Sequence, residues 1–450
     1  MEDAAKVYFV NDRAKLGMNT SIVAKGQWLF EKSGLNECFV KGDSVAIKIH
    51  MGEYYNTGYL RPPIVRGIVE KVKEYGGRPF VTDSTTMLLG AFWGRTTARD
   101  YLETAARNGF TQASMGCPIV ISDGEIGLDD VRVEVPNGII LKETFVAQGI
   151  ADADAVIALS HFKGHDCGVY GGAIKNIGVG CASKRGKMNL HLTNHPKYGI
   201  RNWPYSPEAC KGEKCPQMET CRAICTMEAY KITEDGIIWD KDKCIGCFAC
   251  AIWRLADADC GVIAVPDEWR AGSAIAIADS AAGCQNIIGK EDMGFINYAI
   301  DISPLCDCAP ATDRPVIPNL GVFASRDIVA IDLACLDMSM KMAGTPGSAA
   351  EEEDVLEVGK EKFTGIHPSK ASQWIQINVG VHLGIGTKKY ELIECELGPA
   401  ERFFHPHLRY PDKPAGNRFR KYFKMRSPIP DGGFKYHPDF RITIEDLSKR

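Results

Sequence analysis

Short apolar runs rich in β-branched residues recur along the first part of the chain, at residues 44–49, 78–83 and 155–160. Continuous runs of this length are typical of strands that are buried on both faces of a sheet. Between them, residues 63–75 and 99–108 carry apolar side chains at helical spacing, and glycine follows each segment. Because strands alternate with helices, the pattern predicts an α/β fold, with a mostly parallel sheet and helices on both faces.

The alternation stops near Asn202 and resumes at residues 273–278, a strand-like run of Ser, Ala and Ile. A further strand at 321–324, a helix at 327–340 and an apolar element at 374–378 follow. We therefore expect one α/β core that is interrupted by a separate module. The predicted segments are the core (1–205 and 262–395), a cysteine-rich insert (206–261) and a C-terminal extension (396–450).

The C-terminal extension is aromatic, rich in proline and basic. Its residues 401–450 include 12 Lys or Arg against 6 Asp or Glu. We expect it to wrap its own subunit, a neighbouring copy in a homo-oligomer, or a redox partner.

The overall composition excludes several classes of protein. A net charge of −4 gives no indication of nucleic-acid binding. No apolar run approaches the roughly 20 residues that cross a bilayer. The acidic start, Met1 to Lys6, does not resemble a signal peptide. We therefore expect a cytoplasmic protein that binds neither nucleic acid nor a membrane.

Cysteine is unusually frequent, and 9 of the 17 cysteines fall between residues 210 and 284. In a reducing compartment such clustering indicates metal or redox chemistry rather than disulfides. Cys244, Cys247 and Cys250 are spaced as in bacterial ferredoxins, where a fourth, distant cysteine completes a [4Fe–4S] site. Cys225 supplies that partner. Zinc is the alternative, but four-cysteine zinc sites usually pair two C-x2-C knuckles.

A second [4Fe–4S] cluster would need less regular ligands. Met218 and Arg254 stand where two of its ferredoxin ligands belong. The alternative to a second cluster is a set of free, buried thiols. The candidate ligands of this second cluster are Cys210, Cys215, Cys221 and Cys260.

Polar residues follow three of the predicted core strands, where open α/β sheets bind their ligands. Lys163 and Lys175 flank a glycine-rich run and are expected to hold an anionic ligand such as a phosphate or carboxylate. His165 is a candidate proton donor. Solvated lysines and a structural histidine are the alternative reading. Lys48, Asp83 and Asn176 are the further candidates for binding this ligand or cofactor.

Histidine pairs and a cysteine pair allow a further metal site in the core. His161 and His165 are four residues apart, as are His191 and His195, although the glycines near His165 make a helix there doubtful. Cys306 and Cys308 flank Asp307 and offer two thiolates.

Taken together, these motifs resemble the uncharacterised iron–sulfur center proteins built on domain of unknown function 362. The resemblance spans roughly residues 5 to 395 and implies an α/β core with a ferredoxin-like insert, without naming a substrate. Met218 and Arg254 depart from the family's usual cluster pattern. The resemblance rests on Lys48, Asp83-Ser84, Lys163, His165, Lys175-Asn176 and residues 302–308 and 325–332.

The preferred interpretation is an oxidoreductase in which the insert passes single electrons to or from the ligand of the core. A ferredoxin or another oxidoreductase would be the redox partner. An electron carrier, a cluster-dependent assembly factor and a redox sensor are the alternatives. Electron transfer requires the insert to pack on the strand-end side of the sheet, where Ile245, Phe248, Ile252 and Trp253 are expected to bury the cluster.

Overall fold

The computed structural model describes residues 4–89, 93–251, 260–399, 429–432 and 434–435. The chain forms two compact units, residues 1–398 and 399–450. Nearly all of the second unit lies outside the described residues, so the role of the C-terminal extension stays a prediction. Within the described ranges, no helix combines the length and the apolarity that a membrane span requires.

The core is one eight-stranded sheet with the order β14-β1-β13-β12-β7-β2-β3-β4. Five neighbouring pairs are parallel, and β13 runs antiparallel to both of its neighbours. The carboxyl ends of β2, β3, β7 and β12 therefore meet at one edge. The strands are β1 (Ala5–Asn11), β2 (Ser44–Lys48), β3 (Arg78–Asp83), β4 (Ile119–Ile121), β7 (Ala155–His161), β12 (Met293–Ala299), β13 (Gly321–Ser325) and β14 (Tyr390–Glu394).

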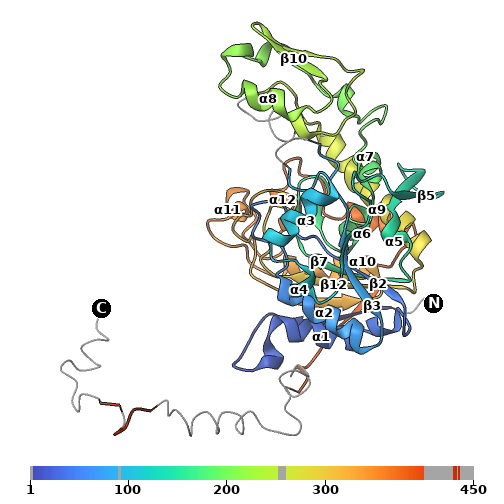
Figure 1. Cartoon of the computed structure of the whole chain (residues 1–450), viewed down its shortest axis with the longest axis vertical. Helices are drawn as coiled ribbons and strands as arrows, with labels where there is room; N and C mark the ends of the chain where they lie inside the picture. Colours follow the sequence, from blue (N-terminus) through green and yellow to red (C-terminus); the bar gives the residue numbers. More distant parts are fainter. Residues whose placement is uncertain (1–3, 90–92, 252–259, 400–428, 433, 436–450) are drawn as a thin grey trace. The chain divides into compact units, whose positions relative to one another are not determined.

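Helices cover both faces of this sheet, as Figure 1 shows, which confirms the predicted α/β class. Alternate residues of a strand serve opposite faces. Ile157 packs with the layer of α1 (Ile22–Lys32), α2 (Pro62–Glu74) and α3 (Ala98–Arg107). Ala158 packs with the opposite layer, and β7 is buried along its whole length because both layers cover it. The opposite layer contains α6 (Ala173–Gly178), α9 (Asp267–Ile288), α10 (Ile328–Met340) and α13 (Ile375–His382).

One predicted strand is a helix. Residues 273–278 lie inside α9, which spans 22 residues. This helix is buried on most of its circumference, so its sequence lacks the polar stripe that marks a surface helix. A short apolar run cannot distinguish such a helix from a buried strand. The strand interpretation of 273–278 was therefore wrong.

Short elements complete the first unit. The remaining helices are α4 (Gln112–Met115), α5 (Gln148–Ala151), α7 (Lys184–Leu190), α8 (Met218–Ile224), α11 (Ala349–Glu352) and α12 (Lys362–Ile366). Three hairpins are formed by β5 (Asp130–Glu134) with β6 (Glu143–Ala147), β8 (Lys163–His165) with β9 (Val169–Gly171), and β10 (Tyr230–Thr233) with β11 (Gly236–Trp239).

The cysteine-rich segment leaves the core and returns to it at one place. Tyr205 and Ile263 form an antiparallel bridge, and the Ser206 amide donates to the Val262 carbonyl at 2.9 Å. Between these points lie α8 and the β10–β11 hairpin (Figure 1). Because the first and last residues of the insert lie side by side, the insert can extend from the core without displacing the core strands that precede and follow it.

Candidate functional site

A cavity of about 480 Å³ opens at the carboxyl ends of β2, β3 and β7. The loop after β12 and the β8–β9 hairpin close its sides. The hairpin is held against that loop by the Gly164 amide, which donates to the Ser303 carbonyl at 2.9 Å. A side chain at Gly164 would lie 2.3 Å from the Pro304 carbonyl oxygen, so only glycine permits this contact. All six core residues proposed from the sequence line the cavity: Lys48, Asp83, Lys163, His165, Lys175 and Asn176.

Lys48, Asp83 and Asn176 bond to one another. The Lys48 ammonium lies 2.9 Å from both the Asp83 carboxylate and the Asn176 side-chain oxygen, and it also donates to the Ile49 carbonyl. Tyr101 donates a hydrogen bond to Asp83. Burial acts to raise the pKa of Asp83, yet Lys48 holds it well below its usual range. All three ammonium donors of Lys48 therefore have protein partners, and its role toward a ligand stays a prediction.

A second charged group joins β7, β8 and the loop after β12. Asp307 accepts from His161 Nδ1 at 2.9 Å and pairs with Lys163 Nζ at 3.1 Å. His161 Nε2 donates to the Ile300 carbonyl at 2.8 Å, so both ring nitrogens are used inside the protein. Burial opposes the charge on Asp307, but His161 and Lys163 keep its pKa well below the usual range. His161 therefore ties β7 to the loop and is not available to a metal.

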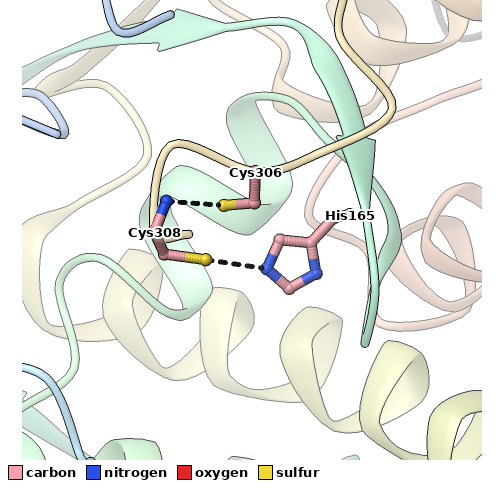
Figure 2. Close-up of side chains that lie close together, drawn as sticks. All are labelled: His165, Cys306 and Cys308. Carbon is pink, nitrogen blue, oxygen red and sulfur yellow. Dashed lines mark hydrogen bonds between the residues drawn. The ribbon is translucent and has the colours of Figure 1, made fainter. Parts of the chain in front are cut away.

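The third group consists of one histidine and two thiols. His165, Cys306 and Cys308 place their ligand atoms within 4.8 Å of one another, a spacing that could hold a metal ion (Figure 2). Lys175 Nζ lies 3.5 Å from the Cys306 sulfur. Against the effect of burial, Cys308 and Lys175 lower the pKa of the Cys306 thiol well below its usual range. Cys306 is the natural thiolate of this group.

The hydrogen bonds of His165 restrict its role. Its Nδ1 accepts from the amides of Cys167 and Gly168 at 3.1 and 2.9 Å. Because Nδ1 cannot also carry a proton, the neutral ring carries its proton on Nε2. This Nε2 lies 4.0 Å from the Cys308 sulfur. His165 is therefore oriented to donate toward the cavity.

A residue far along the chain positions Lys175. Asp332, on α10, accepts hydrogen bonds from the Ala173 and Ile174 amides at 2.7 and 3.0 Å. A side chain at Gly172 would lie 2.4 Å from this carboxylate. Asp332 thus fixes the start of α6, the helix that carries Lys175 and Asn176. The sequence had offered Asp332 only within a resemblance motif and had assigned it no role.

Sequence reasoning missed two further lining cations. Lys187, on α7, is buried, lines the cavity and donates to Ser84, and burial lowers its pKa to about 8. Arg95 lies 2.8 Å from buried Glu53 in a third internal ion pair, after Lys48 with Asp83 and Lys163 with Asp307. Lys187 could have been found from the sequence. Ser183 caps the start of a helix, and the spacing of Lys184, Lys187 and His191 places three polar residues on one face of that helix.

The two members of the pair His191 and His195 have different settings. His191 lines the cavity, and its Nδ1 donates to the Lys187 carbonyl at 2.7 Å. His195 accepts from the Lys197 and Tyr198 amides. The two imidazole rings therefore form hydrogen bonds with different partners.

In the insert, the four thiols proposed for the principal cluster face one another. The thiol of Cys250 interacts electrostatically with those of Cys247, Cys244 and Cys225. Burial is the main cause that raises the pKa of Cys244, Cys247 and Cys250, and a bound metal would reverse this by holding thiolates. Backbone amides donate to these sulfurs, namely Gly246 to Cys244 and Ala249 to Cys247.

The cysteine triple packs on the core through aromatic rings. Phe248 packs against both Trp203 and Trp269, with centroid distances of 5.0 and 5.2 Å, and the two Trp rings also contact each other at 4.9 Å. Arg201 donates to the Cys244 carbonyl at 2.6 Å. Phe248 thus buries the triple as predicted, whereas Ile252 and Trp253 lie outside the described residues.

The contacts of Cys247 place the triple beside the cavity rim. The Leu89 amide donates to its sulfur, and the preceding residue, Leu88, lines the cavity. Lys184 interacts electrostatically with the same thiol. The insert therefore lies on the strand-end side of the sheet.

The second set of cysteines is more dispersed in its contacts. Cys221 lies near Cys225, since both thiols act on Tyr230, while Cys210 accepts from the Gly212 amide at 3.4 Å. The second cluster therefore stays a prediction. Its proposed ligands Cys215 and Cys260 are partly exposed.

Comparisons with known proteins give one family and two partial structural likenesses. No curated protein matches the chain. The lactate racemase apoprotein from Thermoanaerobacterium thermosaccharolyticum is 14% identical over 44% of this chain and 45% of its own, with a TM-score of 0.29. A Thermotoga maritima protein is 10% identical over 62% of this chain and 50% of its own, with a TM-score of 0.31. The chain thus spans about half the length of these solved proteins.

The family match covers most of the core and the whole insert. Residues 45–337 match the family described as "Domain of unknown function (DUF362)". This range includes every cysteine of the insert and all the charged groups of the cavity described above. Since the match spans well over half of the sequence, the chain belongs to the DUF362 family.

Proposed function

We propose that this DUF362 protein is an iron–sulfur oxidoreductase. A [4Fe–4S] cluster held by Cys225, Cys244, Cys247 and Cys250 would exchange single electrons with an anionic ligand in the cavity. A cytoplasmic ferredoxin or another oxidoreductase would supply or accept the electrons. The observation that supports this proposal is the position of the Cys247 thiol beside the cavity, where the Leu89 amide donates to its sulfur and Leu88 lines the cavity.

The separation of the four sulfurs favours a cluster over a zinc ion. Zinc binds cysteine at about 2.3 Å in a tetrahedron, which brings its sulfurs to about 3.8 Å from one another. Among the described residues, the only group of three possible ligands within 4.8 Å is His165, Cys306 and Cys308. No three of the four insert thiols, all in the described part of the chain, meet this limit, which is closer than the corners of a cubane would need but which the ligands of one zinc ion would satisfy. Amide donors on the sulfurs also tune such clusters.

The charges of the cavity favour an anion as its ligand. Lys163 and Lys175 both line it, and they are only 4% and 8% exposed. Lys163 already pairs with Asp307, but Lys175 lies beside a sulfur, and a phosphate or carboxylate would add charge-assisted hydrogen bonds to its ammonium. His165 Nε2–H would be within the same space as the proton donor.

Iron analysis of Cys247→Ser tests the proposal. The full chain, reconstituted anaerobically, should bind about four irons, or about eight if the second cluster forms. Cys247→Ser should lose about four of them, because a cubane needs its three adjacent thiolates. Cys117→Ser is the matched control, because Cys117 is buried outside the insert. Zinc in place of iron, or an unchanged iron content in Cys247→Ser, would contradict the proposal.

A further inference from the structure

The cavity contains two thiols that the iron–sulfur proposal does not use. Cys306 is buried and Cys308 is partly exposed, and both line the cavity. Figure 2 shows the Cys306 sulfur directed toward the Cys308 amide and the Cys308 sulfur directed toward the His165 ring. The group that they form with His165 is unique among the described residues in its close spacing.

The Cys306 sulfur receives two donors that suit a thiolate. The Cys308 amide donates to the Cys306 sulfur at 3.3 Å, and the Lys175 ammonium lies 3.5 Å from it. The amide two residues after a cysteine donates in the same way at Cys244 and Cys247, the proposed cluster ligands. The backbone turn that surrounds the insert's ligands therefore recurs at Cys306. Cys306 and burial raise the pKa of the Cys308 thiol, so both sulfurs can be thiolates together only when a cation lies between them.

His165 is suited to hydrogen bonding rather than to coordination. A metal-bound histidine almost always donates a proton from its other nitrogen to a carbonyl, a carboxylate or water. His165 has the opposite arrangement, because its Nδ1 accepts two amide protons. Its protonated Nε2 points to the Cys308 sulfur.

We propose that Cys306 and Cys308 bind one thiophilic divalent metal ion at the wall of the cavity. The two thiolates balance the charge of the ion, which is of the Zn²⁺ class. His165 and Lys175 are positioning residues that donate to the two sulfurs. With the ion bound, the single Nε2 proton of His165 serves the Cys308 sulfur in place of the ligand. The remaining coordination positions face the cavity, where the anionic ligand would complete them. This centre is separate from the cluster of the insert, so either can exist without the other.

Cobalt titration of the full chain tests this site, because Co²⁺ bound by thiolates shows a charge-transfer band. After anaerobic assembly of the cluster, we expect one Co²⁺ per chain with this band. Cys306→Ser and Cys308→Ser should each abolish the band while iron content stays unchanged. Cys167→Ser is the matched control and should keep the band, because Cys167 is a buried thiol that lines the same cavity.

His165→Ala separates hydrogen bonding from coordination. The variant should still bind one Co²⁺, with the band retained and an affinity about 10- to 100-fold weaker, as outer donors typically contribute. Loss of stoichiometric binding in His165→Ala would overturn the assignment of this residue. Unchanged binding and spectrum in both cysteine variants would overturn the site. Repeating the titration in Cys247→Ser keeps failure of the metal site distinguishable from failure of the cluster.

Discussion

Buried charges in the cavity differ in how completely the protein compensates them. Lys48 has a carboxylate, an amide oxygen and a carbonyl as partners, and Lys163 has Asp307 and a carbonyl. Within the described part of the chain, the Cys306 sulfur is the sole hydrogen-bond partner of Lys175. Lys175 is therefore the lysine of the cavity with the most capacity left for a ligand.

Replacing Lys175 by Met should weaken anion binding. Hydrogen bonds to charged groups contribute about 1.5–3 kcal/mol, so the affinity for phosphate should fall roughly 10- to 100-fold. Isothermal titration calorimetry of the full chain measures this directly. Lys71→Met is the control, because Lys71 is also 8% exposed but pairs with Glu31 and Glu74 on the other face of the sheet. Equal phosphate affinity in Lys175→Met and wild type would contradict the prediction.

His191 should make the protein sensitive to acid. Burial lowers its pKa to about 3, while the unfolded chain takes up the proton near pH 6.5. Its contribution to stability is therefore present above pH 6.5 and is lost as the pH falls. At pH 5 the loss is about 2 kcal/mol. His191→Asn keeps a donor for the Lys187 carbonyl but cannot titrate.

The free energy of unfolding, measured in urea at pH 7 and pH 5, gives the comparison. Its fall between these pH values should be about 2 kcal/mol smaller in His191→Asn than in wild type. His382→Asn, at an exposed histidine, should leave the fall unchanged. An identical fall in His191→Asn and wild type would show that His191 is not kept neutral by the fold.

Single elements show which local signals the sequence carried. The predicted strands at 44–49, 78–83 and 155–160 correspond to β2, β3 and β7, because an apolar β-branched run bounded by polar residues has few other structures available. Asp327 caps α10 by accepting from the Val329 and Ala330 amides, which is why that helix could be placed from sequence. The prediction for α9 was wrong because this helix is buried on most sides, so its sequence lacks the polar stripe of a surface helix.

The loop between Cys244 and Cys247 contacts the core, and Gly246 is the residue of this loop that lies against Thr193. Its φ of +74° favours glycine, and an added Cβ would lie 2.8 Å from the Cβ of Thr193. Gly246 therefore lies directly against the core. Gly246→Ala should therefore destabilise the chain and loosen the contact that places the cluster.

Gly384 provides a control for the backbone strain alone. Its φ is +72° and an added Cβ would meet nothing within 4 Å. Gly384→Ala should lower the free energy of unfolding by about 1–2 kcal/mol and leave iron content intact. Gly246→Ala should lower the free energy of unfolding by more than Gly384→Ala does, and it should also lower the iron content. Equal costs and equal iron content in the two variants would show that the Thr193 contact has no role.

At the scale of the whole molecule, the sequence could predict the ends of strands but not what meets across them. Lys48, Asp83 and Lys163 were placed at one edge because parallel strands align their carboxyl ends. The contact of His165 with Cys306 and Cys308 joins segments about 140 residues apart, and no local pattern predicts it. The hydrogen bonds of Asp332 with the first residues of α6 likewise join distant segments, and no local pattern predicts them. Such contacts depend on how loops pack after the sheet has formed.

An anaerobic crystal structure with anomalous data at the iron edge tests the central claim most directly. We expect a four-iron peak among Cys225, Cys244, Cys247 and Cys250, beside Leu89 at the cavity rim, with ligand density near Lys175. A single-ion peak at the four thiols, or no iron there, would contradict it.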